Sequence, residues 1–148
     1  PNLTRMLEEA GAFIVFDRFC FGALPGREVI ELNDEEPALR QICRHYLLTS
    51  ECPRFMSNEK IAQRRETADR LAREYSADGI IYENVKFCDF WGFERALASH
   101  VQHEEYGHPV LTIDRPYNAR TSGQLRTRFQ AFVESLEIKR IQQGKEVK

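Results

Sequence analysis

Three short apolar runs constrain the fold more than any other feature of this 148-residue sequence. They lie at residues 12–17 (AFIVFD), 79–85 (GIIYENV) and 109–114 (PVLTID). The apolar residues in each run are nearly continuous rather than strictly alternating, which is typical of strands that are buried on both faces of a parallel sheet. We therefore expect a parallel sheet that is covered by helices on both sides.

Helical periodicity fills the segments around these runs. Residues 2–10 predict a first helix that ends at Gly11, since glycine suits the left-handed position after a helix. Apolar residues spaced three and four apart predict four more helices, over residues 39–47, 61–75, 93–101 and 125–136. We expect Cys43 to lie in the core, because it belongs to the apolar stripe of the second helix. Thr121 and Ser122 are candidate N-caps of the last helix.

The order of these elements is α-β-α-α-β-α-β-α, and strands that alternate with helices are joined by right-handed crossovers. The sequence thus predicts one α/β domain over residues 1–148. Its expected architecture is a small doubly wound, flavodoxin- or Rossmann-like parallel sheet flanked by helices. The chain starts with Pro1 and the first helical pattern begins almost at once, so we expect a piece of a longer protein.

Composition excludes several classes of partner and compartment. The formal net charge of -2 gives no general attraction to nucleic acid or to an anionic membrane. No apolar run approaches the roughly 20 residues that a membrane helix needs, and no secretory signal pattern opens the chain, so a cytoplasmic location is expected. The sequence has four cysteines without a C-x-x-C pair, and we expect them to be reduced.

Cys88 is the most informative candidate for chemistry. It follows the second apolar run and precedes a helix, and ligands of open α/β sheets bind beyond the carboxyl ends of the strands. The positive end of a helix favours the thiolate, which is the form that binds metals. The alternative is a small buried residue under a loop. Cys20 follows the first run in the same way, but Phe19 and Phe21 beside it equally favour a packed hydrophobic loop.

Other candidate sites carry a weaker signal. Residues 121–128 (TSGQLRTR) combine hydroxyls, a glycine and two arginines at a helix start, which suits either phosphate or carboxylate binding or a plain cap with solvated arginines. His100, His103 and His108 suggest zinc, but their surroundings favour a solvated surface. The sequence has neither a Walker-type loop nor a G-x-G-x-x-G motif, so any energy coupling has to come from another protein.

Several of these segments together resemble one known family. The resemblance is to the C-terminal domain of the subunits of 2-hydroxyacyl-CoA dehydratase and benzoyl-CoA reductase, and it spans nearly the whole chain. The matching segments are residues 12–20, 52–54, 77–81 (ADGII), 86–89 (KFCD), 109–114, 122–128 (SGQLRTR) and 131–134 (AFVE).

The resemblance implies an iron–sulfur subunit of an anaerobic acyl-CoA enzyme. Such subunits hold a four-iron four-sulfur cluster through three cysteines drawn from two lobes, which implies Cys88 as the ligand from this lobe. Cys20 matches a position near the site and is a second candidate ligand of iron. The implied partners are an N-terminal lobe, a related second subunit, an ATP-hydrolysing activator that donates electrons, and an acyl-CoA substrate. The reaction is either the dehydration of a 2-hydroxyacyl-CoA, as in a lyase, or the reduction of an aromatic ring, as in an oxidoreductase.

The resemblance also gives the start of the last helix a role. Ser122, Gly123, Gln124, Arg126 and Arg128 are candidates for orienting the reaction or contacting acyl-CoA. One cysteine does not build a cluster, so we expect the isolated chain to be inactive. Two alternatives from other classes stay open: a flavodoxin-like assembly domain with a structural Cys88, and a thiol redox module that uses Cys20 and Cys88.

Overall fold

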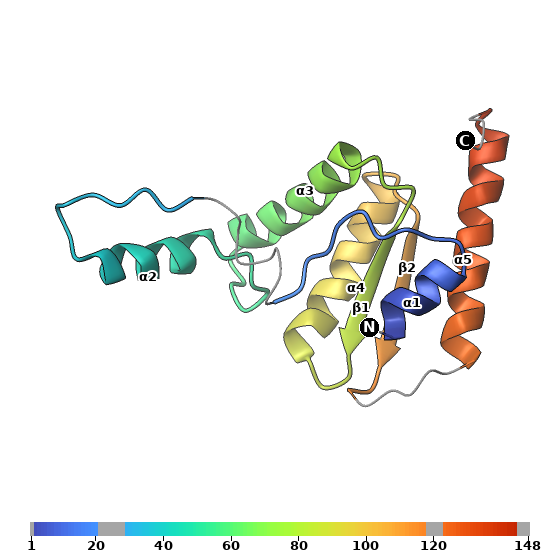
Figure 1. Cartoon of the computed structure of the whole chain (residues 1–148), viewed down its shortest axis with the longest axis horizontal. Coiled ribbons are helices and arrows are strands. Elements are labelled where there is room, and N and C mark those ends of the chain that lie inside the picture. The colour runs from blue at the N-terminus through green and yellow to red at the C-terminus, as the bar shows by residue number, and fades with distance from the viewer. Residues whose placement is uncertain (1, 21–28, 118–122, 145–148) are drawn as a thin grey trace.

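The computed structural model describes residues 2–20, 29–117 and 123–144. These residues form an α/β fold in which a small parallel sheet is flanked by helices, as the sequence predicts (Figure 1). The elements are α1 (Asn2–Glu9), α2 (Ala38–Thr49), α3 (Asn58–Glu74), β1 (Ile80–Val85), α4 (Asp89–Glu104), β2 (Val110–Arg115) and α5 (Gly123–Gln142).

The sheet of the described residues pairs β1 with β2 in parallel, from Ile80 opposite Val110 to Val85 opposite Arg115. The crossover is α4, which packs against both strands and carries α3 on its outer side. The other face of the sheet holds the core cluster of Met6, Leu7, Ile113 and Phe129, so α1 and α5 cover that face. Helices thus lie on both faces of the sheet.

Gly79 lets α5 pack closely against the start of β1. A Cβ atom at this position would lie 2.8 Å from Cζ of Phe132 and 3.2 Å from Cδ2 of Leu136. Both side chains belong to the apolar stripe that predicts this helix from the sequence. The close approach explains why the second apolar run begins with a glycine, a residue that otherwise weakens strands.

The predicted first strand is wrong. Residues 12–17 are not part of the sheet, and in Figure 1 they run as an irregular segment from α1 towards α3. Phe13 is largely exposed, whereas the Phe16 ring packs against Tyr75 with 5.1 Å between centroids. An apolar run indicates that a segment favours burial and extension, but a strand also needs a free sheet edge in register, which composition does not report.

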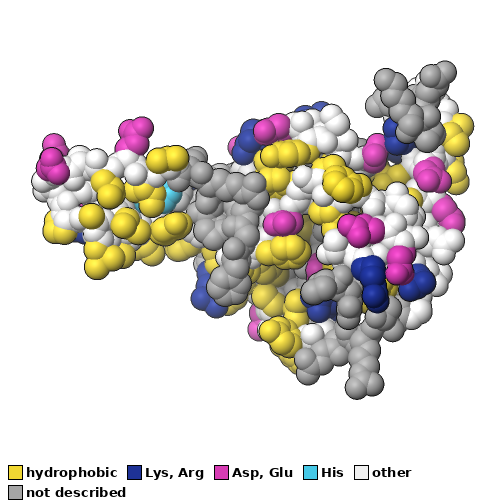
Figure 2. All heavy atoms as spheres, viewed as in Figure 1, with side chains coloured by type: hydrophobic (Ala, Val, Ile, Leu, Met, Phe, Trp, Pro, Cys, Tyr) yellow, Lys and Arg dark blue, Asp and Glu magenta, His cyan; other side chains and the backbone are white. Residues whose placement is uncertain are grey.

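The position of α2 also differs from the expectation. The helix forms where the sequence predicts it, yet none of its residues is buried, and Leu39 and Leu47 are 72% and 64% exposed. Cys43 is exposed, so its predicted place in the core is wrong. Figure 1 shows α2 projecting away from the sheet, and Figure 2 shows hydrophobic side chains gathered on it. Periodicity defines an apolar face but not what covers that face.

Among the described residues, no helix is both long and apolar enough to cross a membrane.

Candidate functional site

Cys88 occupies the N-cap position of α4, three residues after the end of β1. Its backbone N–H donates to the Val85 carbonyl at 3.0 Å, and its carbonyl accepts from the Gly92 N–H at 2.9 Å. Its side chain makes no capping hydrogen bond and is partly exposed. The backbone of Cys88 is therefore fixed at the positive end of the helix, while the partly exposed thiol does not serve as the cap.

Phe87, directly before Cys88, has an unusual conformation. Its φ angle is +73°, and its side chain is 98% exposed. Non-glycine residues with positive φ are uncommon, and for a bulky side chain the conformation is strained. Such strain clusters at functional sites.

A polar triad at the carboxyl edge of the sheet joins β1, β2 and α4. Asn84 and Asp114 are register partners, and the buried Asn84 Nδ2 donates to Asp114 Oδ1 at 2.9 Å. The Arg95 guanidinium lies 3.2 Å from the other oxygen of Asp114. Because Arg95 is in the second turn of α4, the triad holds the start of that helix, and with it Cys88, against the end of the sheet.

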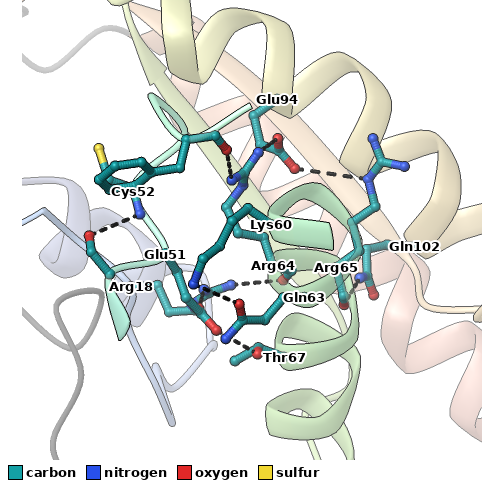
Figure 3. Close-up of polar contacts among 12 residues, drawn as sticks. Arg18, Glu51, Cys52, Lys60, Gln63, Arg64, Arg65, Thr67, Glu94 and Gln102 are labelled. Atoms are coloured by element: carbon teal, nitrogen blue, oxygen red, sulfur yellow. Dashed lines mark hydrogen bonds and ion pairs between the residues drawn. The ribbon is translucent and has the colours of Figure 1, made fainter. Parts of the chain in front are cut away.

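A buried ion pair couples α3 to α4 (Figure 3). Arg64 Nη2 lies 2.6 Å from Glu94 Oε2, and the two side chains are only 2% and 4% exposed. Gln102 Nε2 donates to the Arg65 carbonyl at 2.8 Å. Sequence reasoning missed this network, although one signal was present: Arg64 lies three residues after Ile61 and four before Ala68, on the apolar face of its helix.

Arg18 extends this network to the segment that carries Cys20. It forms an ion pair with Glu51 and donates to the Arg64 carbonyl at 3.2 Å. Burial lowers the pKa of Arg18, and burial also raises the pKa of Tyr82, which lines the same small cavity, to about 12. Arg18 is therefore a largely buried residue beside α3. Cys20, two residues further on, is exposed.

The turn around Cys52 lies against the first turn of α4. Pro53 is fully buried, and the Arg54 guanidinium lies 5.5 Å from the centroid of the Phe90 ring. Arg64 Nη1 donates to the Phe55 carbonyl at 2.8 Å. The half-buried Cys52 thus belongs to a turn that borders the helix start after Cys88, a placement that the sequence alone did not give.

The start of α5 shows only part of the predicted anion site. Ser122 lies outside the described residues, and the helix begins at Gly123, with Gln124 exposed. Arg126 pairs with Glu9 of α1 at 2.8 Å, and Arg128 donates to the Thr112 carbonyl at 2.6 Å. Both arginines therefore tie α5 to neighbouring elements, and their proposed contact with a substrate stays a prediction.

The zinc hypothesis gains no support from the placement of the histidines. His108 Nε2 contacts Asp69 at 2.7 Å, and His103 pairs with Glu104 on the surface of α4. Within residues 2–20, 29–117 and 123–144, no three His, Cys, Asp or Glu side chains converge on a metal position. The donor set at the sheet edge fits one thiolate ligand of a metal cluster and does not complete a cluster.

Comparison with known proteins gives the class of protein to which this fold and site belong. Residues 1–136 match the family model of the 2-hydroxyglutaryl-CoA dehydratase D-component, so the chain belongs to this family. The resemblance to dehydratase subunits seen in the sequence is confirmed.

Two curated relatives carry the names of dehydratase subunits. A protein of Escherichia coli (strain K12), provisionally named dehydratase subunit YjiM, is 29% identical over 137 residues, which are 91% of this chain and 34% of that protein. The (R)-phenyllactyl-CoA dehydratase beta subunit of Clostridium sporogenes is 30% identical over 135 residues, with the same two shares. The chain thus spans about a third of the length of these relatives. No solved structure matches the chain significantly.

Proposed function

We propose that this chain is the C-terminal lobe of an iron–sulfur subunit that dehydrates a 2-hydroxyacyl-CoA. The observation that carries the proposal is the position of Cys88: in a member of a dehydratase family, a cysteine occupies the N-cap position of a helix at the carboxyl edge of a parallel sheet. The names of the relatives favour dehydration over the reduction of an aromatic ring.

The residues of this chain have defined roles in that proposal. Cys88 supplies one thiolate ligand, which the positive end of α4 stabilises. The triad of Asn84, Arg95 and Asp114 keeps the helix start in place. A cluster held by Cys88 and two further cysteines would have one iron without a cysteine ligand, and it would supply electrons and Lewis acidity at a substrate oxygen. The remaining ligands come from outside the described residues.

The proposed partners follow from the same assignment. An N-terminal lobe and a related second subunit complete the site, and an ATP-hydrolysing activator supplies low-potential electrons, since this sequence has no nucleotide-binding loop. Cys20 is proposed to lie beside the cluster. Ser122, Gly123, Gln124, Arg126 and Arg128 are proposed to border the acyl-CoA, and the assembled enzyme is proposed to work in the cytoplasm.

Anaerobic purification of the full-length protein tests the proposal. We expect a brown protein with about four iron atoms per site. Cys88→Ser should lose the iron and the dehydration of 2-hydroxyacyl-CoA, whereas the matched variant Cys43→Ser should keep both, because Cys43 is an exposed residue of α2. A colourless, iron-free protein after anaerobic reconstitution would exclude the proposal, and so would a Cys88→Ser variant with full activity, which is the outcome for an assembly domain.

A further inference from the structure

Phe87 combines two unfavourable features, and nothing else in the described chain compensates for their free-energy cost. Its backbone is held at φ +73°, where glycine is favoured, and its side chain is 98% exposed to solvent. An exposed ring gains nothing from apolar burial, and it does not relieve the backbone. Glycine at this position would therefore make the folded chain alone more stable.

The surrounding structure imposes the strained conformation. The Lys86 N–H donates to the Arg115 carbonyl at 2.8 Å, and the Cys88 N–H donates to the Val85 carbonyl at 3.0 Å. These bonds fix the residues on both sides of Phe87. The triad of Asn84, Arg95 and Asp114 holds β1, β2 and α4 together. Strain persists where neighbours over-determine a residue in this way, and it marks functional sites.

Comparison with other residues shows that Phe87 is unusual in both respects at once. Ser76 is the other described non-glycine residue with a positive φ, at +51°, but it is a small polar residue beyond the end of α3, where this conformation is common. Phe13 and Phe93 are also exposed, but their φ angles are not positive. Within residues 2–20, 29–117 and 123–144, strain and exposure of a large apolar side chain coincide only at Phe87, and this residue adjoins the candidate ligand.

We propose that Phe87 is a shielding residue, whose ring covers the iron–sulfur cluster held at Cys88 and limits the access of water and chelators. This inference rests on the proposed function. The apolar shell around a metal site controls solvent access. Loss of the hydrogen-bonding partners of metal ligands typically costs 10- to 100-fold in metal affinity, and this range sets the scale for a change in the shell. An exposed aromatic ring next to the ligand residue supplies such a shell once the cluster is bound.

The experiment compares variants of the full-length protein with its partner subunit under anaerobic conditions. The variants are Phe87→Ala, Phe87→Gly and Phe87→Tyr, with Ser76→Gly as the matched control for strain relief. The measurements are iron content, the rate of loss of cluster absorbance after addition of a chelator, and Tm. We expect Phe87→Ala and Phe87→Gly to lose the cluster about tenfold faster than the parent protein. Phe87→Tyr keeps the ring and should lose the cluster at the parent rate.

The Tm values measure backbone strain separately from the shielding of the cluster. Phe87→Gly should have a higher Tm than Phe87→Ala, because glycine tolerates positive φ, and Ser76→Gly should raise Tm without changing cluster loss. Parent-like cluster loss in Phe87→Ala overturns the shielding role, even if subunit association weakens, and so does rapid loss in Phe87→Tyr. A parent protein that binds no iron overturns the proposed function itself, which is a distinguishable result.

Discussion

At the scale of single residues, Asp114 connects the candidate site to the sheet. One of its carboxylate oxygens accepts a hydrogen bond from Asn84, and the other forms an ion pair with Arg95. Asp114→Ala leaves the buried amide of Asn84 without its acceptor, and we expect a loss of about 1–2 kcal/mol in the free energy of unfolding. Urea denaturation followed by the fluorescence of the single tryptophan, Trp91, measures this loss.

The control for Asp114 is the substitution Asp114→Asn. It keeps an acceptor for Asn84 but removes the charge that faces Arg95, so it should cost less than the alanine variant. If both variants unfold at the same urea concentration as the parent chain, the triad does not stabilise this edge of the sheet.

Asp69 gives a prediction for the dependence of stability on pH. Burial raises the pKa of its carboxyl, but hydrogen bonds from Arg73 and His108 outweigh this effect, and the pKa is lowered. A lowered pKa in the folded state contributes stability that is present above the unfolded pKa of about 3.9 and is lost as the pH falls through the folded value. Asp69→Asn should therefore show a shallower loss of unfolding free energy than the parent chain below about pH 4.

Acid titration of the parent and of Asp69→Asn, each with chemical denaturation at several pH values, tests this linkage. Glu105→Gln, at the exposed C-cap of α4, is the control and should follow the parent curve. Parallel curves for the parent and Asp69→Asn would contradict the linkage.

At the residue scale, only part of the candidate site is predictable from the sequence. Cys88 was placed at a strand end and a helix start because two changes of hydrophobic period meet there. The triad was not foreseen, because the pairing of Asn84 with Asp114 depends on strand register across 30 residues. The positive φ of Phe87 was not foreseen either, since it arises from hydrogen bonds on both sides of the turn.

At the scale of elements, the packing of α3 on α4 depends on the buried pair of Arg64 and Glu94. Removing one partner leaves an unpaired buried charge, so Glu94→Ala should cost about 3–5 kcal/mol in unfolding free energy. Replacing both partners by apolar residues of similar size, as Arg64→Met with Glu94→Leu, should cost clearly less than the single change, because no charge is left buried. Urea denaturation of the parent chain, Glu94→Ala and the double variant decides this, and a double variant less stable than Glu94→Ala would contradict it.

Helices and strands were predictable to different extents for a physical reason. The five predicted helices all form, because helix signals are local: Ser57 caps α3 by accepting from the Lys60 N–H, and Gly11 has the positive φ of a helix end. A strand needs a distant partner as well. Residues 80–85 and 110–115 pair with each other, whereas residues 12–17 have similar composition and stay outside the sheet.

At the scale of the whole molecule, the apolar stripe of α2 is the feature that the described chain leaves uncovered. Leu39, Leu47 and Leu48 are exposed on a helix of 12 residues, a length that is marginal for an isolated helix in water. The curated relatives are about three times as long as this chain, which covers 34% of each. We propose that the other lobe of such a subunit covers this stripe.

A charge on the stripe tests this arrangement. Leu47→Glu in the 148-residue chain should change the free energy of unfolding by less than about 0.5 kcal/mol, because the side chain is already exposed. In the full-length protein the same change buries a charge if the other lobe covers α2, and unfolding should then become easier by several kcal/mol. Ile141→Glu, on the exposed face of α5, is the control and should be mild in both proteins. Equal effects of the two substitutions in the full-length protein would mean that α2 stays exposed there and would contradict the proposal.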